Sequence, residues 1–375
     1  MLKVLDTSHS TGPQETFVLN LGPQHPATHG VLRVKLTMDG EFITNAEIVC
    51  GYIHREHEKM GENRKWDQFL PNTSRIDYLS AMMYTHAYVA VVEKAAGIQV
   101  PRRAEYVRVL TSEMNRITSH LLWWGAFLID LGGLTPMLYA FDDREMVLDL
   151  LEALTGARLT FCYYRFGGLC DDVTDDFLTG TRKFVKHFRP RLKIFRRLVT
   201  DNIIVRKRLE DLGHVPAEMC RKYGATGPMI RGAGVAYDVR RAEPYSVYPE
   251  LEFDIPTQPA GDNMARYLVR MAEMEQSLRI IEQTLDKMPD GPFMAKVPRI
   301  LRPPAGDYVF AVESARGRFE VRVVSSGKEI PHRVRLRSPC FCNLSVFEEA
   351  CRGMLLADAL ALMGSIDLVI PDIDR

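Results

Sequence analysis

An apolar repeat between Met264 and Met288 limits the possible folds more than any other part of the sequence. Its members follow one another at spacings of three and four residues: Met264, Leu268, Met271, Met274, Leu278, Ile281, Leu285 and Met288. This spacing predicts one long helix that packs along another helix. Asp262 stands where a side chain can cap the start of such a helix, and Pro289 follows its end.

Other helices are predicted earlier in the chain and near its end. An apolar stripe that starts at Ile76 and Leu79 predicts a helix over about residues 75–96, which puts Tyr78 in its first turn. Gly97 is expected to end this helix. The remaining predicted helices cover about residues 103–131, 144–155, 171–190 and 344–363.

The most apolar stretch, residues 121–141, contains one formal charge, Asp130. The stretch is long enough to span a bilayer, but Gly132, Gly133 and Pro136 interrupt it, and a carboxylate near its middle is costly in lipid. We therefore interpret it as a buried helix that ends near Asp130. Because an unpaired buried charge is expensive, Asp130 is expected to be neutral or bonded to another group. A plain alternative is that it caps the next turn.

Short strands are predicted at both ends of the chain. Apolar and polar residues alternate over 32–38, and Asp39-Gly40 predicts a hairpin whose return strand covers residues 42–49. Further strands are predicted at about 308–312, 319–324 and 333–337, and loops with short strands at 213–262. The predicted fold class is α+β, a central helical bundle with small antiparallel sheets from the N- and C-terminal parts.

The domain organisation follows from the absence of repeats and long linkers. Residues 1–16 are polar and are predicted to form a flexible tail. Residues 17–375 are predicted to form one domain.

A loop rich in proline and glycine, residues 22–30, precedes the first hairpin and contains His25 and His29. Each proline restricts its own backbone and that of the residue before it, so the loop is expected to be stiff. Such a loop could hold the imidazoles of His25 and His29, a side chain that titrates near neutral pH, in fixed orientations. The alternative is a proline-rich turn with two solvated histidines.

Composition excludes several classes of function. Lys plus Arg and Asp plus Glu both number 48, so no net charge attracts nucleic acid or anionic lipid. The seven cysteines include no C-x-x-C pair, which favours reduced thiols. The basic segment 182–197 is typical of a helix that meets solvent or an acidic partner, with nucleic-acid binding as a weak alternative. No nucleophile elbow, H-E-x-x-H motif or P-loop is present.

Titratable residues in unusual settings are the candidate chemical groups. They are His25, His29, Arg55, Tyr78 and Asp130. A tyrosine, a histidine and an aspartate that met in one site could pass protons to a bound acceptor.

Several motifs in order along the chain carry a family resemblance. They are Gly22 to Arg33, Gly51-Tyr52-Ile53-His54-Arg55, Ser74-Arg75-Ile76-Asp77-Tyr78, Asp130 to Pro136, Glu313-Ser314-Ala315-Arg316-Gly317, and Gly364-Ser365-Ile366-Asp367 through Asp374-Arg375. With them the sequence resembles the 49-kilodalton (D) subunit family of respiratory complex I, the NADH–quinone oxidoreductase.

The resemblance implies a fold, partners and a location. The fold is that of the large subunit of nickel–iron hydrogenases, and the chain binds no cofactor of its own. A 4Fe-4S cluster belongs to the adjacent B subunit, FMN and NADH bind elsewhere in the complex, and quinone is the substrate. The implied partners are the B, C and I subunits and the H subunit of the membrane arm, at the cytoplasmic face of a bacterial cell membrane. The implied activity is that of a proton-pumping enzyme.

The resemblance also assigns roles to four residues. His29 and Tyr78 match the residues that bind the quinone headgroup, and Asp130 matches the acid that pairs with the histidine. These three are the implied catalytic residues. Arg55 matches an arginine near the cluster of the B subunit. Glu56 stands where the family usually has glycine, and its carboxylate could pair with Arg55.

Departures and alternatives remain. Hydrogenases of this fold hold nickel with two cysteine pairs, but segments 75–78 and 372–375 contain no thiol, so no metal site is expected. A related oxidoreductase linked to ferredoxin or coenzyme F420 is one alternative. A purely structural subunit is another.

Overall fold

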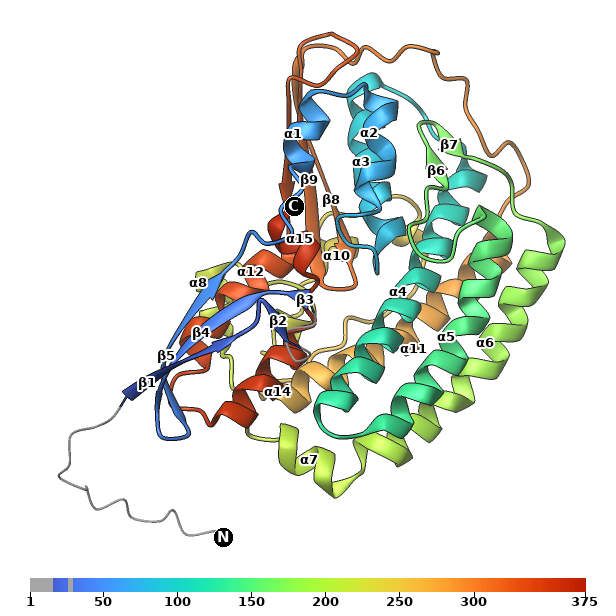
Figure 1. Ribbon diagram of the computed structural model, residues 1–375. Helices are drawn as coiled ribbons and strands as arrows, with labels where there is room; N and C mark the ends of the chain where they lie inside the picture. The colour runs from blue at the N-terminus through green and yellow to red at the C-terminus, as the bar shows by residue number, and fades with distance from the viewer. Residues whose placement is uncertain (1–15, 26–29) are drawn as a thin grey trace.

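The computed structural model describes residues 16–25 and 30–375 (Figure 1). Its centre is a bundle of long helices, in which α11 (Asn263–Lys287) packs against α4 (Arg102–Asp130) and α6 (Asp175–Phe195). The long helix predicted from the apolar repeat is therefore confirmed.

Two further contacts complete the bundle. Helix α5 (Leu134–Thr155) packs against both α4 and α6, and Figure 1 shows the four helices side by side. Asp262 caps α11 as predicted, because its side chain accepts a hydrogen bond from the Ala265 backbone N–H at 2.7 Å.

Shorter helices surround this bundle. They are α1 (His57–Glu62), α2 (Trp66–Thr73), α3 (Ala81–Ala96), the π-helix η2 (Arg196–Thr200), α7 (Ile203–Leu209), α8 (Ala217–Tyr223), α9 (Pro228–Arg231), α10 (Val239–Ala242), the 3-10 helix η3 (Tyr248–Glu250), α12 (Pro339–Ser345), α13 (Phe347–Ala350), α14 (Leu356–Ile366) and α15 (Ile370–Asp374).

The N-terminal sheet has the strand order β1-β4-β5 and is antiparallel. Its strands are β1 (Thr16–Leu21), β4 (Arg33–Asp39) and β5 (Phe42–Val49). Alternate residues of β4 are buried, as the period-two pattern predicts. Beside this sheet, β2 (Gln24–His25) pairs with β3 (Gly30–Val31).

The C-terminal sheet has the order β10-β9-β8 and is also antiparallel. Its strands are β8 (Gly306–Ser314), β9 (Gly317–Ser325) and β10 (Arg333–Arg337), and α3 packs against β8 and β9. A third, minor pairing joins β6 (Tyr164–Arg165) to β7 (Gly168–Leu169). The α+β class with small antiparallel sheets from both ends of the chain is confirmed.

One helix begins later than predicted. Helix α3 starts at Ala81, so Tyr78 lies in the turn before it and not in its first turn. The cause is Asp77, whose Oδ1 accepts hydrogen bonds from the backbone N–H groups of Leu79 and Ser80 at 3.0 and 3.2 Å. This local bonding competes with the helix.

Two other helix boundaries near prolines differ from the prediction. Helix α5 starts at Leu134 and not after Asp143, because Pro136 falls in its first turn, where the missing N–H costs nothing. Helix α6 continues through Pro190, where a stop was predicted. Phe188 and Phe195 on both sides of that proline are fully buried, so packing outweighs the lost hydrogen bond.

In two regions the predicted secondary structure is wrong. The predicted helix over 344–363 is divided into parts of α12, α13 and α14, with Gly353 at φ +77° between the last two. The region 213–262 forms short helices and loops, where short strands were expected.

The structure shows what becomes of the apolar stretch 121–141 and of the basic segment 182–197. Within the described residues no helix has the length and apolar character needed to cross a membrane. In the basic segment, Arg182 pairs with Asp286 of α11 and Arg189 with Glu282 of α11, at 2.8 Å each. Its charge therefore meets acidic residues of the same chain.

Candidate functional site

Tyr78 lies in the turn between α2 and α3, which covers residues 74–80. Its ring is half-buried, and its hydroxyl makes no hydrogen bond to any residue that the structure describes. Burial, and secondarily the charge of Asp77, raise the pKa of Tyr78 above the usual value for a phenol. The phenol thus stays protonated at neutral pH and is available as a hydrogen-bond donor to a ligand.

A buried arginine holds this turn in place. The Arg316 guanidinium, from the turn between β8 and β9, donates to Asp77 Oδ2 at 3.1 Å and to Asp367 Oδ1 at 2.9 Å. It also donates to the hydroxyls of Ser80 and Ser119 at 3.1 and 3.0 Å. All of these side chains are buried, so the charges are closely paired away from water.

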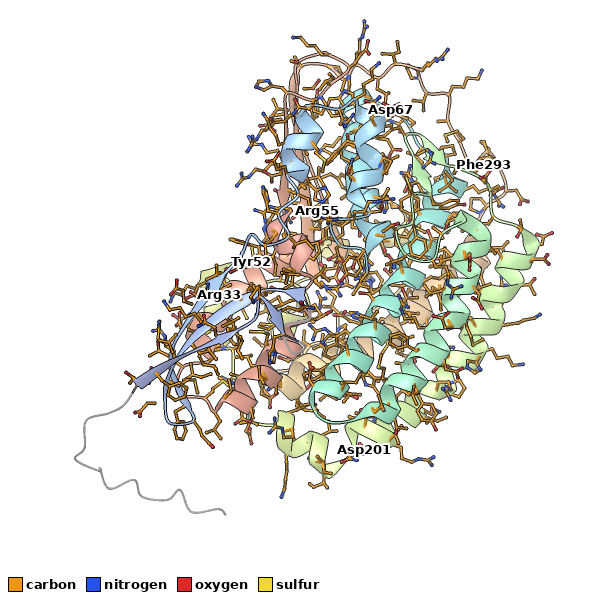
Figure 2. The ribbon with its side chains drawn as sticks, in the orientation of Figure 1. Arg33, Tyr52, Arg55, Asp67, Asp201 and Phe293 are labelled. Atoms are coloured by element: carbon orange, nitrogen blue, oxygen red, sulfur yellow. The ribbon has the colours of Figure 1, made fainter. Side chains whose placement is uncertain are left out.

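The connector between β5 and α1 brings Arg55 to the same turn. The exposed Arg55 side chain donates to the backbone carbonyl of Arg75 at 2.6 Å, and Figure 2 shows it beside Tyr52 on this connector. Within the described part of the chain, no carboxylate lies within 4.0 Å of the Arg55 guanidinium. The suggested pairing of Glu56 with Arg55 is therefore absent, because Glu56 takes the left-handed conformation at the start of α1 (φ 55°).

The C-terminal helix anchors this connector. The Asp374 carboxylate accepts hydrogen bonds from the backbone N–H groups of Gly51 and Ile53, each at 2.9 Å. The backbone carbonyl of Asp374 lies 2.5 Å from His54 Nδ1. Segments 75–78 and 372–375 are thus close to each other, because the connector bonds Arg75 through Arg55 and is bonded by Asp374.

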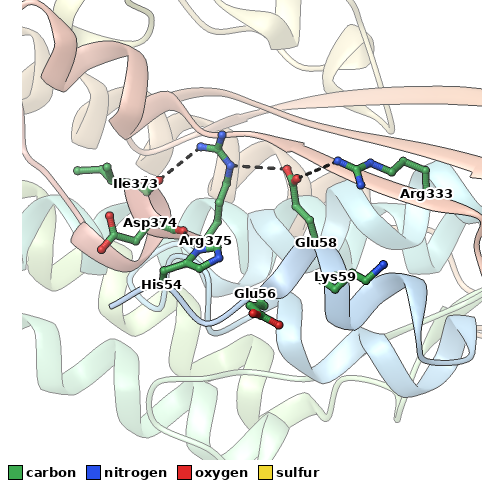
Figure 3. A pocket seen from close by; sticks show the side chains of 8 residues that line it. All are labelled: His54, Glu56, Glu58, Lys59, Arg333, Ile373, Asp374 and Arg375. Atoms are coloured by element: carbon green, nitrogen blue, oxygen red, sulfur yellow. Dashed lines mark hydrogen bonds and ion pairs between the residues drawn. The ribbon is translucent and has the colours of Figure 1, made fainter. Parts of the chain in front are cut away.

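A cleft of about 360 Å³ opens between the connector and the C-terminus (Figure 3). Arg375 lies in it, 3.6 Å from the Glu58 carboxylate, and Arg333 lies 3.8 Å from the same group. The lining is mostly charged, which is typical of a surface that meets a polar partner and untypical of a small-molecule pocket.

Asp130 ends α4 and is half-buried against α14. A Cβ atom placed on Gly364 of α14 would lie 3.3 Å from Asp130 Oδ2 and 2.7 Å from the Phe127 ring. Trp123 of α4 donates its indole N–H to the Gly364 carbonyl at 2.8 Å. Only glycine therefore allows this close approach of α4 and α14.

The end of the histidine-containing loop meets the same part of the chain. Gly30 follows His29 in sequence, and a Cβ atom placed on it would lie 2.5 Å from Cγ1 of Ile370 in α15. His25 pairs with Gly30 in the β2–β3 ladder. His29 itself lies outside the described residues, so the meeting of His29, Tyr78 and Asp130 in one cavity stays a prediction.

Residues 364–372, which we call the α14–α15 junction, connect all of these groups. Gly364 contacts Asp130, Asp367 pairs with Arg316 beside the Tyr78 turn, and Ile370 contacts Gly30. These contacts bring three regions that are distant in sequence to one short segment. Among the described residues, no group of three His, Cys, Asp or Glu side chains is arranged to hold a metal ion.

Comparisons with known proteins identify the family. A family profile described as "Respiratory-chain NADH dehydrogenase, 49 Kd subunit" matches residues 130–305 and 299–375. A protein of Opitutus terrae, named as the second D subunit of its NADH-quinone oxidoreductase, is 72% identical over 364 residues, which cover 97% of this chain and 91% of that protein. The chain belongs to this 49-kDa subunit family.

Other members of the 49-kDa subunit family are also similar over nearly the whole chain. The proteins named as the D subunit of NADH-quinone oxidoreductase in Desulfotalea psychrophila and Geobacillus thermodenitrificans are 65% and 46% identical, over 97% and 96% of this chain. The matches cover 98% and 99% of those proteins. The resemblance found in the motifs is therefore confirmed.

Sequence reasoning missed the residues that hold the site together. The sequence shows Arg316 and Asp367 only as parts of motifs, and it assigns no role to Asp372, Ser338 or Tyr84. One signal was present for the acids: Asp367 and Asp372 stand within an otherwise apolar segment, where a carboxylate needs a partner.

An exposed apolar patch lies at the end of the bundle where α4 passes into α5. Leu134, Leu138, Ile203 and Ile204 form it and are between 62% and 65% exposed. A groove of about 240 Å³ beside them is lined mainly by apolar residues such as Leu131, Pro136, Leu198 and Val205. Asp201, labelled in Figure 2, marks this end of the molecule. Such patches are typical of surfaces that bind a partner.

Proposed function

We propose that this chain is the quinone-binding subunit of the peripheral arm of a proton-pumping NADH–quinone oxidoreductase. The observation that carries the proposal is the α14–α15 junction, which adjoins Asp130, the Tyr78 turn and the loop end at Gly30. The names of the related proteins, which contain both the donor and the acceptor, support the same reaction.

The proposed chemistry is proton donation to a reduced quinone. A quinone that takes up two electrons becomes a dianion unless two protons arrive with them. Tyr78 donates from its phenol, which burial keeps protonated, and His29 donates from an imidazolium. The proton that His29 gives up removes a positive charge beside Asp130, its proposed partner. That change of charge is the proposed signal to the proton-pumping membrane arm.

The proposed electron donor is a 4Fe-4S cluster of the B subunit, next to Arg55. An exposed guanidinium at this place would stabilise the extra negative charge of a reduced cluster. The charged cleft around Glu58 and Arg375 is the proposed surface for such a partner. The C and I subunits and the H subunit of the membrane arm are the other proposed neighbours, at the cytoplasmic face of the membrane.

A photoreactive quinone tests the proposed site directly. In the assembled complex, an azido-quinone should label the peptide that contains Tyr78, because its ring is only half-buried and its hydroxyl bonds no described residue, which leaves it open to a ligand. Excess unlabelled quinone should prevent this labelling, as mass spectrometry of the digested chain would show. Labelling confined to peptides away from residues 74–80, 130 and 364–372 would contradict the proposed site.

Charge placed in the apolar patch should prevent assembly. We propose that the membrane arm covers this patch, since Leu134 follows Asp130 by one turn of chain and so continues the proposed quinone site. The double variant Leu138→Glu and Ile204→Glu should lose most of its co-purification with the membrane arm, because two carboxylates would be desolvated at the contact. Its unfolding temperature should change little, because both side chains are exposed.

A matched control lies just beyond the other end of α5. Leu159 is 40% exposed, and Leu159→Glu should leave co-purification unchanged. Equal assembly of the control and the double variant would show that the patch is not a contact.

A further inference from the structure

A buried acid behind the Tyr78 turn has no part in the chemistry proposed so far. Asp372 of α15 is fully buried. Its Oδ2 accepts hydrogen bonds from the Ser338 hydroxyl at 2.5 Å and from the Cys340 backbone N–H at 3.2 Å, both at the start of α12. Its Oδ1 has no hydrogen-bond partner among the described residues, and neither has the buried Tyr84 hydroxyl that lies beside it.

Charge counting singles out this acid. The cluster contains three carboxyl groups, of Asp77, Asp367 and Asp372. Arg316 pairs with the first two, and Arg270 lies 3.8 Å from Asp367. Within the described residues no Lys or Arg nitrogen lies within 4.0 Å of Asp372. Asp372 is therefore the carboxyl group for which no cation remains.

The groups that face Asp372 come from three elements. They are Asp77 in the turn before α3, Tyr84 of α3, and Ser338 and Cys340 of α12. Burial first, and the charge of Asp77 second, raise the pKa of Asp372 to about 6, against the opposing effect of the hydrogen bonds. The group thus exchanges a proton close to neutral pH, unlike an ordinary aspartate.

The cluster also reaches Tyr78. Asp77 precedes Tyr78 in the sequence, and both Asp77 and the buried Cys340 thiol contribute to the raised pKa of the Tyr78 phenol. Cys340 is the residue whose backbone N–H binds Asp372. Cys340 therefore acts on both the carboxyl group of Asp372 and the phenol of Tyr78.

We propose that Asp372 stores a proton for Tyr78 at mildly acidic pH: it holds the proton on Oδ1 at rest and returns it after Tyr78 has protonated the reduced quinone. The inference rests on the proposed function. The step breaks the O–H bond of the Asp372 acid and re-forms the O–H bond of the phenol, and Asp372 recovers its proton from solvent. It runs downhill, because a tyrosinate is a much stronger base than this carboxylate. Asp372 acts through Tyr78 and does not touch the quinone.

The pH dependence of quinone reduction tests this role in the assembled complex. With quinone saturating, the wild-type rate should fall as the pH rises through the region of about 6, because Asp372 then loses its stored proton. Asp372→Asn should lower the rate on the order of tenfold at acidic pH and remove this inflection. A wild-type inflection that persists in Asp372→Asn would overturn the proposal.

Variants that keep the acid but change its polar surroundings give an independent test. Ser338→Ala removes a bond that stabilises the ionised carboxylate, so the inflection should move to higher pH. Tyr84→Phe removes the hydroxyl group beside the carboxylate and should move the inflection in the same direction. Asp358→Asn on α14 is the control, since Asp358 pairs with Arg208 away from the cluster, and it should leave the inflection in place. An inflection that stays in place in both Ser338→Ala and Tyr84→Phe would contradict the proposal, even if Asp372→Asn fails to assemble.

The two proposals can fail separately. Loss of azido-quinone labelling at the Tyr78 peptide would count against the quinone site itself. Retained labelling together with an unchanged pH profile in Asp372→Asn would overturn only the proton-storing role.

Discussion

Replacing Arg316 by methionine should lower the free energy of unfolding by about 3–5 kcal/mol, because it leaves buried carboxylates without their cation. Arg316 is fully buried and bonds both Asp77 and Asp367. It joins the turn before α3 to the end of α14, so its loss should also free the Tyr78 turn. The midpoint of urea unfolding of the purified chain would measure the change.

The control for this variant lies on the neighbouring strand. Arg322 pairs with Asp307 on the surface, and the two side chains are 55% and 45% exposed. Arg322→Met should therefore leave stability nearly unchanged, because an ion pair in water contributes little. If Arg316→Met and Arg322→Met unfold at the same urea concentration, the buried cluster does not stabilise the fold as argued.

Replacing Tyr78 by phenylalanine should lower quinone reduction by roughly 10²–10⁴-fold, the range expected when a general acid is removed. The ring and its packing remain, so assembly should be normal. Because the pKa of Tyr78 is raised, the phenol is protonated throughout the neutral range, so the variant should stay slower than the wild type at every pH from 6 to 8. Steady-state rates of the assembled complex with a short-chain quinone would measure this loss of quinone reduction.

A second tyrosine separates this effect from a general loss of hydroxyl groups. Tyr308 of β8 lies in the C-terminal sheet, where its hydroxyl makes a 3.4 Å contact with the Pro304 carbonyl. Tyr308→Phe should leave the rate unchanged. Unchanged activity in Tyr78→Phe would favour a purely structural role for the chain.

Most of the helical and strand segments could be predicted because their signals are local. The three- and four-residue spacing before Met288, the period of two in 32–38 and the Asp39-Gly40 turn each lie within a short stretch of chain. The apolar stretch was correctly interpreted as a helix that ends at Asp130. The predicted ends of helices are wrong where a side-chain hydrogen bond or packing against distant residues outweighs the local helix propensity. Asp77 and Pro190 mark two such places.

The sequence by itself determined the family, through motifs in order along the chain, and the candidate residues Arg55, Tyr78 and Asp130. Only the tertiary structure decided which groups support them. Arg316 and Asp77 are 239 residues apart, and Asp372 meets Ser338 across 34 residues. Burial sets the charge of such groups, and burial depends on which distant segments pack together, which no local pattern records.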